Sequence, residues 1–214
     1  VSGGATLFGG NDRFENVNAV TVVGDVGDEN SNSSFANTGV VNGGDDVFSF
    51  IRPSGSNVSS VFDRLVGDVD YNAFGGIVNG GNDTFIMRGF NHANVIHGDV
   101  TVSFGILNGG DDFISIGDAD FGSDAQPNSI NLNRVYGDFS SIADNGGSTF
   151  SASGGDDTIE VFNTSLNTVA GDGNDVDGVI QFDGGNDIIR VGPKLGTDSS
   201  FSPSSNGFGS VSQI

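Results

Sequence analysis

Short runs of alternating apolar and polar residues recur along the whole chain, and turn-forming residues separate them. Val, Ile, Phe and Thr dominate the runs, whereas Gly, Asn and Asp lie between them. Such alternation is typical of short β-strands with one buried face. No segment keeps the i, i+3, i+4, i+7 apolar spacing of an amphipathic helix over three turns. The pattern therefore predicts an all-β protein.

A double glycine followed by Asn or Asp and then Asp separates two of these runs at six places. The copies lie at residues 9–12, 43–46, 80–83, 109–112, 154–157 and 184–187. Strands are predicted after the motif at residues 47–51, 84–87, 113–116, 158–162 and 187–191. They are predicted before it at residues 39–41, 76–78, 105–107, 149–152 and 179–182. A unit that recurs at intervals of 29 to 45 residues indicates a repeat architecture.

A second motif, a Val-rich run ending in Gly-Asp, falls between every two successive double-glycine motifs. Its Gly-Asp pairs are residues 24–25, 67–68, 98–99, 137–138 and 171–172. Each unit is thus predicted to hold three short strands, with Ser-, Asn- and Gly-rich loops at residues 29–38, 53–60, 119–129 and 144–148. The prediction is a parallel β-solenoid of about six irregular coils, stacked at ~4.8 Å. The spacing suits either one wide coil or two flattened coils per unit.

This solenoid, a β-roll or β-helix, is predicted to span residues 1–191. Residues 192–214 form a Ser- and Gly-rich tail without either motif, and a cap, an exchanged strand or disorder all fit its composition. The apolar residues after the double glycine are expected to stack as one interior ladder of Phe48, Phe85, Phe113, Ile159 and Ile188. A surface platform for carbohydrate stacking is the alternative for these rings.

The charge of the chain adds a functional expectation to this predicted fold. The chain has 28 acidic and 7 basic residues, for a net charge of −21. All but three of the acids are Asp, which is a turn former and a hard oxygen ligand. The partner implied is a cation. Nucleic acid is excluded because the few basic residues are dispersed. Membrane insertion is not expected, since no apolar run approaches the ~18 residues of a spanning helix.

The last Asp of each double-glycine motif defines a column of carboxylates if the turns stack. At ~4.8 Å spacing such carboxylates repel by about 1 kcal/mol in water and more in a protein interior. A divalent cation between successive turns reverses the sign of this interaction, and Ca²⁺ fits best because it accepts six to eight oxygens in flexible geometry. Turn carbonyls can supply further oxygens, whereas the alternative is turn capping alone. The predicted ligands are Asp12, Asp46, Asp83, Asp112, Asp157 and Asp187.

Two further sets of residues are candidate ligands. The residues before the column supply additional oxygens at Asn11, Asp45, Asn82, Asp111, Asp156 and Asn186. The Gly-Asp motif provides a separate second edge, whose members act either as ligands or as turn formers: Asp25, Asp68, Asp99, Asp138 and Asp172, together with Asp175.

The motifs resemble those of the RTX (repeats-in-toxin) parallel β-roll proteins, whose nonapeptide is Gly-Gly-x-Gly-x-Asp-x-apolar-x. Residues 44–48 and 81–85 match its second half, and residues 171–175 match it more fully. The leading glycines are usually replaced and the units are longer than nine residues. The resemblance implies that the Asp of each Gly-x-Asp binds Ca²⁺. It also implies bacterial secretion and folding outside the cell, so an extracellular or cell-surface location is expected.

No sequence signature of catalysis accompanies the repeats. The chain lacks a His-Glu-x-x-His zinc motif and a Gly-x-Ser-x-Gly elbow, and no pair of acids stands out from the repeat. We therefore expect a non-enzymatic, secreted calcium-binding structural protein that assembles with copies of itself into a surface layer, filament or matrix. The alternative is a calcium-dependent adhesion module for cell-surface polysaccharide, or the RTX part of a larger secreted protein.

Overall fold

A computed structural model of the protein describes eleven segments of the chain. They are residues 6–16, 21–27, 39–51, 60–72, 76–88, 91–103, 105–117, 132–143, 151–162, 168–177 and 181–191. These segments form β-strands and turns and contain no helix. Accordingly, the described residues hold no helix that is long and apolar enough to cross a membrane. The predicted tail and most of the predicted loops lie outside the described residues.

The strands form four parallel sheets, and the double-glycine motif joins the first two. Sheet A precedes the motif and contains β1 (Thr6–Phe8), β4 (Val40–Asn42), β8 (Ile77–Asn79), β12 (Ile106–Asn108), β16 (Ser151–Ser153) and β20 (Gln181–Asp183). Sheet B follows the motif and contains β2 (Arg13–Glu15), β5 (Val47–Ile51), β9 (Thr84–Arg88), β13 (Phe113–Ile116), β17 (Thr158–Val161) and β21 (Ile188–Val191).

The Gly-Asp motif joins the other two sheets. Sheet C precedes it and contains β3 (Thr21–Val23), β6 (Ser60–Val66), β10 (Asn91–His97), β14 (Leu132–Tyr136) and β18 (Thr168–Ala170). Sheet D follows it and contains β7 (Val69–Asn72), β11 (Val100–Ser103), β15 (Phe139–Ala143) and β19 (Gly173–Asp177).

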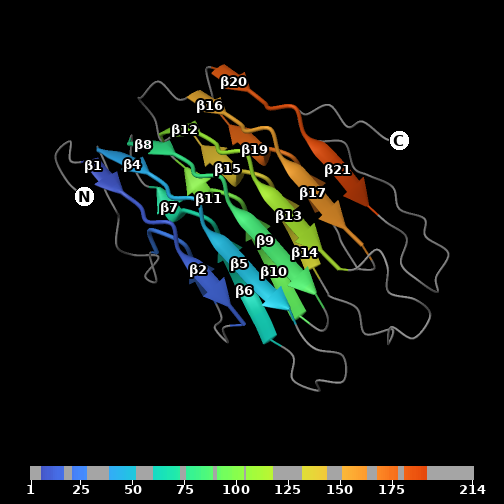
Figure 1. Ribbon diagram of the computed structural model, residues 1–214. Coiled ribbons are helices and arrows are strands. Elements are labelled where there is room, and N and C mark those ends of the chain that lie inside the picture. Colours follow the sequence, from blue (N-terminus) through green and yellow to red (C-terminus); the bar gives the residue numbers. More distant parts are fainter. Residues whose placement is uncertain are drawn as a thin grey trace, which may run out of the picture.

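The chain passes through sheets A, B, C and D in turn, and equivalent strands of successive coils pair in parallel (Figure 1). Four coils contribute a strand to all four sheets. For example, Phe48 of β5 pairs in register with Phe14 of β2 and with Phe85 of β9. The predicted parallel β-solenoid is therefore confirmed. The prediction of three strands per coil is wrong, because sheet D adds a fourth. The strands of sheet D are short and interrupt their few apolar residues with polar ones such as Asp70 and Ser140. Their alternation in the sequence is therefore hard to recognise as a strand.

Two hydrophobic cores run along the stack instead of one. The first lies between sheets B and C and includes Phe48, Leu65 and Phe85. The second lies between sheets A and D and includes Val78 and Phe139. Sheets A and B meet at the double-glycine turn and sheets C and D meet at the Gly-Asp turn. Each coil is thus a pair of flattened apolar lobes, joined where these two turns face each other.

The aromatic ladder of the first core is confirmed in part. Phe14, Phe48 and Phe85 stack with ring centroids 5.0 and 4.4 Å apart. Phe113 and Ile188, however, are 37% and 47% exposed.

The next residues, Ile114 and Ile189, occupy the ladder in their coils, so the assignment of Phe113 and Ile188 was wrong by one position. The second residue after the Asp points inward in every coil, because side chains alternate along a strand. In these two coils the residue directly after the Asp is also apolar, and it lies on the outer face.

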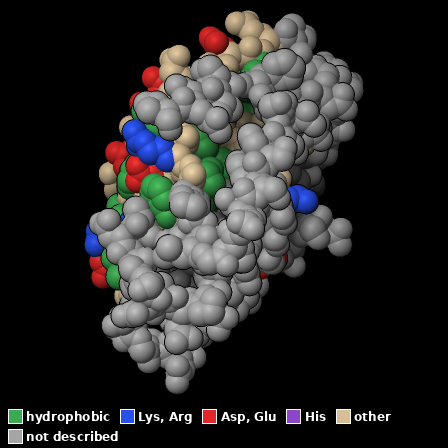
Figure 2. All heavy atoms as spheres, turned by 90° about the vertical axis from the view of Figure 1, so that its right-hand side faces the viewer, with side chains coloured by type: hydrophobic (Ala, Val, Ile, Leu, Met, Phe, Trp, Pro, Cys, Tyr) green, Lys and Arg blue, Asp and Glu red, His purple; other side chains and the backbone are tan. Residues whose placement is uncertain are grey.

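The outer surface carries mixed side chains where it is described. Figure 2 shows the molecule from the side on which β21 lies in Figure 1, with apolar, acidic and basic groups next to one another. On the outer surface of the solenoid, Arg190 forms an ion pair with Glu160 of the neighbouring coil at 2.8 Å. Such an exposed pair contributes about 0–1 kcal/mol. The residues that could form a functional site lie inside the stack instead.

Candidate metal centre

The Asp of each double-glycine turn uses one carboxylate oxygen to bind the turn of the preceding coil. The backbone amide of Asp46 donates to Oδ1 of Asp83 at 2.7 Å, and the amide of Asp83 donates to Oδ1 of Asp112 at 2.6 Å. The same bond joins Asp12 to Asp46, Asp112 to Asp157 and Asp157 to Asp187. These five bonds hold the carboxylates of Asp46, Asp83, Asp112, Asp157 and Asp187 in one file along the stack.

The Asp of each Gly-Asp turn reaches across to the double-glycine turn on the opposite wall. Oδ2 of Asp68 accepts from the amide of Gly81 at 2.8 Å, and Oδ2 of Asp99 accepts from Gly110 at 3.0 Å. The equivalent acceptors in the other coils are Asp25, Asp138 and Asp172. The Gly-Asp side chains therefore enter the same space as the double-glycine side chains.

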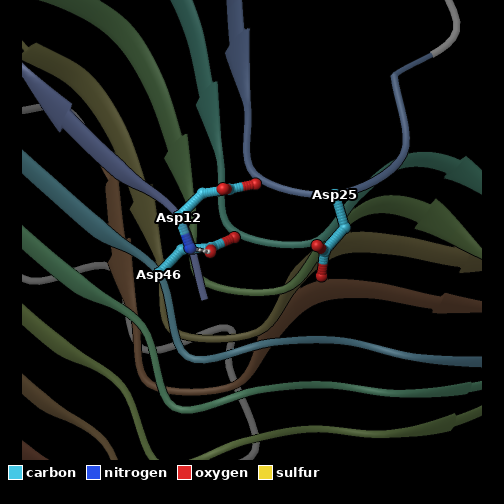
Figure 3. A group of neighbouring side chains, drawn as sticks. All are labelled: Asp12, Asp25 and Asp46. Carbon is cyan, nitrogen blue, oxygen red and sulfur yellow. Dashed lines mark hydrogen bonds between the residues drawn. The ribbon is translucent and has the colours of Figure 1, made fainter. Parts of the chain in front are cut away.

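Three groups of carboxylates converge in this space. Each group joins two successive double-glycine Asp residues to the Gly-Asp residue between them, and one oxygen of each side chain lies within 4.8 Å of the others. Figure 3 shows the first group, in which Asp12 and Asp46 come from one wall and Asp25 from the other. The groups are Asp12–Asp25–Asp46, Asp46–Asp68–Asp83 and Asp83–Asp99–Asp112.

The expected arrangement of two separate edges is therefore corrected to one shared column. The two turns are distant in each unit of sequence, but they face each other where the two apolar lobes meet. The column continues through the later coils, because the charges of Asp138 and Asp157 are among those that raise the pKa of Asp112. It lies between the two hydrophobic cores.

Nine of the eleven carboxylates in the column are buried, and each of these nine leaves one oxygen without a partner. The nine are at most 7% exposed, whereas Asp12 is exposed and Asp25 is half-buried. Within the described residues, the second oxygen of each accepts no hydrogen bond, and these side chains are Asp46, Asp68, Asp83, Asp99, Asp112, Asp138, Asp157, Asp172 and Asp187. Buried polar atoms in proteins are almost always satisfied. A file of unsatisfied anionic oxygens could therefore hold a metal ion.

The pKa values of these carboxyl groups are raised, because their charged forms are buried next to one another. Burial, with the charges of neighbouring carboxylates, raises the pKa of Asp83 and of Asp157 to about 10. Burial also raises the pKa of Asp46 to about 7 and that of Asp138 to about 8. Burial removes water from the charged form and like charges oppose ionisation. The charged column is therefore unfavourable without protons or cations, and its buried carboxylates could hold a metal ion.

The glycines of both motifs make the approach of the two turns possible. A Cβ atom at Gly67, in a Gly-Asp turn, would overlap Oδ2 of Asp83 and the carbonyl oxygen of Gly98. A Cβ atom at Gly80, in a double-glycine turn, would overlap the carboxylate of Asp99. Each carboxylate thus packs on the bare Cα of the opposite turn, which only glycine allows.

The same contacts identify which of the turn carbonyls lie beside the column. The Gly98 carbonyl oxygen and the free Oδ2 of Asp83 both lie beside the Cα of Gly67. Equivalent carbonyls lie beside Asp46, Asp112 and Asp157, and they belong to Gly67, Gly137 and Gly171. Carboxylate and carbonyl oxygens are hard ligands. The buried groups can therefore hold a metal ion through oxygen atoms alone.

The residues before the column lie outside it. Asn11, Asp45, Asn82, Asp111, Asp156 and Asn186 are exposed. Their side chains accept hydrogen bonds from the amide of the following coil, as when Oδ1 of Asp45 accepts from Asn82 at 3.0 Å. Direct ligation by this set stays a prediction. Asp175 pairs with Ser141 in sheet D through its backbone, and its side chain is not among those described.

Two buried polar residues lie apart from the column. Asp70 forms an ion pair with Arg64 at 2.6 Å and accepts a hydrogen bond from Thr101 at 2.9 Å. His97 stacks on Tyr136, and burial together with Arg64 and Arg134 lowers its pKa to about 3. Neither residue belongs to a carboxylate group. Among the side chains that the structure describes, the candidate centre therefore contains no histidine ligand.

Comparison with protein-family models, with curated proteins and with solved structures gives no match for this chain.

Proposed function

We propose that this chain is a secreted calcium-binding structural protein whose interior carboxylate column holds a file of Ca²⁺ ions. The single observation that carries the proposal is the set of nine buried carboxylates, each with one oxygen fixed by a backbone amide and the other free. Fixed oxygens set the geometry of a site, while free oxygens supply its charge. No catalytic pair is needed to explain any member of the set.

The chemistry of the donors favours Ca²⁺ over other ions. All donors are hard oxygens, and the turn carbonyls raise the number available to each ion. Ca²⁺ accepts six to eight such ligands with flexible geometry, whereas Mg²⁺ requires a smaller octahedral cage and retains its waters. The resemblance to RTX repeats supports the same choice. It also supports an extracellular location, where calcium is abundant enough to load weak sites.

The test is a calcium titration of the metal-free protein followed by circular dichroism at neutral pH. We expect a β signal that grows as Ca²⁺ is added, since cations offset the repulsion within the column. Mg²⁺ at the same concentrations serves as the matched control and is expected to restore little signal. A β signal that is complete in chelator and unaffected by Ca²⁺ would contradict the proposal.

We further propose that calcium-loaded coils of separate molecules stack end to end. The support is exposed apolar side chains on the first and last strands of the described stack: Phe8 of β1 is 75% exposed, and Ile188 and Val191 of β21 are 47% and 40% exposed. Edge strands also present unpaired backbone groups. Stacking of successive copies would continue the sheets and generate a filament.

Sedimentation of the calcium-loaded protein over a range of concentrations tests the assembly. We expect growth beyond the monomer that Phe8→Asp suppresses without changing the β signal. A calcium-loaded chain that stays monomeric at high concentration would overturn the assembly and leave the adhesion module as the better account.

A further inference from the structure

Three strands of sheet A end in an Asn that is followed directly by the first glycine of the double-glycine turn. The pairs are Asn42-Gly43, Asn79-Gly80 and Asn108-Gly109. The three Asn residues occupy one position of the coil, because Asn79 pairs in register with both of the others. The same position carries Ser153 in the fifth coil and Asp183 in the sixth.

The glycine of each pair is required by the carboxylate column. A Cβ atom at Gly43 would overlap Asp68, one at Gly80 would overlap Asp99, and one at Gly109 would overlap Asp138. The metal centre therefore forces glycine to follow whatever residue ends the sheet A strand. When that residue is Asn, the chain acquires an Asn-Gly pair.

Asn-Gly pairs carry an intrinsic chemical reactivity. The backbone nitrogen of the glycine attacks Cγ of the Asn side chain, a C–N bond forms, and the side-chain nitrogen leaves as ammonia. The resulting five-membered succinimide is then opened by water at either carbonyl, which gives Asp or isoaspartate. Glycine offers the least steric hindrance to this attack. The reaction requires a backbone nitrogen free of other bonds and a carboxamide free to rotate towards it.

The fold blocks both requirements. The amide of Gly43 donates to the carbonyl of Asn79, that of Gly80 to Asn108 and that of Gly109 to Ser153, each at 2.7 Å. The carboxamides are fixed in a ladder along the stack. Nδ2 of Asn79 donates to Oδ1 of Asn42 at 2.7 Å, and Nδ2 of Asn108 donates to Oδ1 of Asn79 at 2.7 Å.

We propose that Asn42, Asn79 and Asn108 are modification sites that stay silent in the stacked solenoid and become reactive when the coils separate. Isoaspartate adds one atom to the main chain immediately before the double-glycine turn. It therefore displaces the Asp that follows from the carboxylate column, and the altered chain no longer restacks. The inference rests on the proposed function in one respect, that loss of Ca²⁺ is what separates the coils.

The experiment incubates the full chain in calcium, in chelator, and in chelator with urea, and quantifies Asp and isoaspartate at the three sites by mass spectrometry. We expect both calcium-free samples to react at least about tenfold faster than the calcium sample, because reaction proceeds through the opened state. Equal rates in all three samples would overturn the inference.

A different outcome would count against the proposed function alone. If urea accelerates the reaction but chelator alone does not, the fold protects the three sites and calcium is not what maintains the fold. The triple variant N42S/N79S/N108S is the control, since Ser153 shows that serine fits this position. We expect it to recover its full β signal when calcium is returned after long incubation in chelator. Wild-type protein that recovers equally well would contradict the loss of restacking.

Discussion

Each buried Asp of the column divides its carboxylate between two tasks. In Asp83 one oxygen accepts the amide of Asp46, and the other has no partner among the described residues. The alignment of these Asp residues along the stack was predictable from the sequence, because the motif repeats six times. It did not predict that Asp68 and Asp99 lie in the same column, since the meeting of the two turns depends on how the walls of the coil fold together.

Replacing Asp83 by Asn tests this division of tasks. The amide oxygen of Asn still accepts the hydrogen bond from Asp46. The substitution removes the free anionic oxygen that Asp83 contributes to two of the three-carboxylate groups. We expect the calcium concentration at half-folding to rise at least about tenfold, the effect that even outer-shell changes have on metal sites. Asp45→Asn, in the double-glycine turn of the preceding coil and exposed, is the control. Equal shifts for both variants in a calcium titration would contradict the assignment.

Replacing Gly67 by Ala tests the close approach of the turns. The added Cβ would overlap Oδ2 of Asp83 and the Gly98 carbonyl, and overpacking of this kind costs about 1–3 kcal/mol. Gly10→Ala is the matched control, because no atom lies within 4 Å of the Cβ position there. We expect urea unfolding in calcium to show a loss for G67A and a change within about 0.5 kcal/mol for G10A. Equal stability of the two variants would count against the packing.

At the level of the elements, strand alternation sets which side chains enter the cores. Sheets A, B and C were predictable from their apolar runs next to glycine turns. Sheet D was missed because strands such as β7 and β15 carry Asp70 and Ser140 between their apolar residues. The one-residue error at Phe113 has the same origin, since two adjacent apolar residues leave the inward position undecided until the register is known.

Two Phe residues in neighbouring coils test the register. Phe85 is fully buried in the first core, whereas Phe113 is 37% exposed on the outer face. We expect Phe85→Ala to lower the free energy of unfolding by about 3–5 kcal/mol. Phe113→Ala should cost less than about 1 kcal/mol. Urea unfolding in calcium measures both, and a larger effect at Phe113 would contradict the register.

For the molecule as a whole, a charged column between two apolar cores makes metal-free stability depend on pH. Burial raises the pKa of Asp187 to about 6 and of Asp46 to about 7, above the ~3.9 of an unfolded Asp. Between these values the folded chain binds more protons than the unfolded chain. The stability of the metal-free fold therefore falls as pH rises through this window.

We expect circular dichroism in chelator to show more β structure at about pH 5 than at about pH 8. Saturating calcium should abolish this loss at the higher pH, because the cation replaces the protons. A metal-free chain that instead gains β structure as pH rises would contradict the buried column.

The most direct test of the metal centre is anomalous X-ray diffraction from crystals grown in calcium. The account predicts a file of anomalous peaks inside the solenoid, between the double-glycine and Gly-Asp turns and beside the free oxygens of Asp46, Asp83 and Asp112. Peaks confined to the exposed side of the turns, at Asp45 and Asp111, or an interior column without any peak, would contradict it.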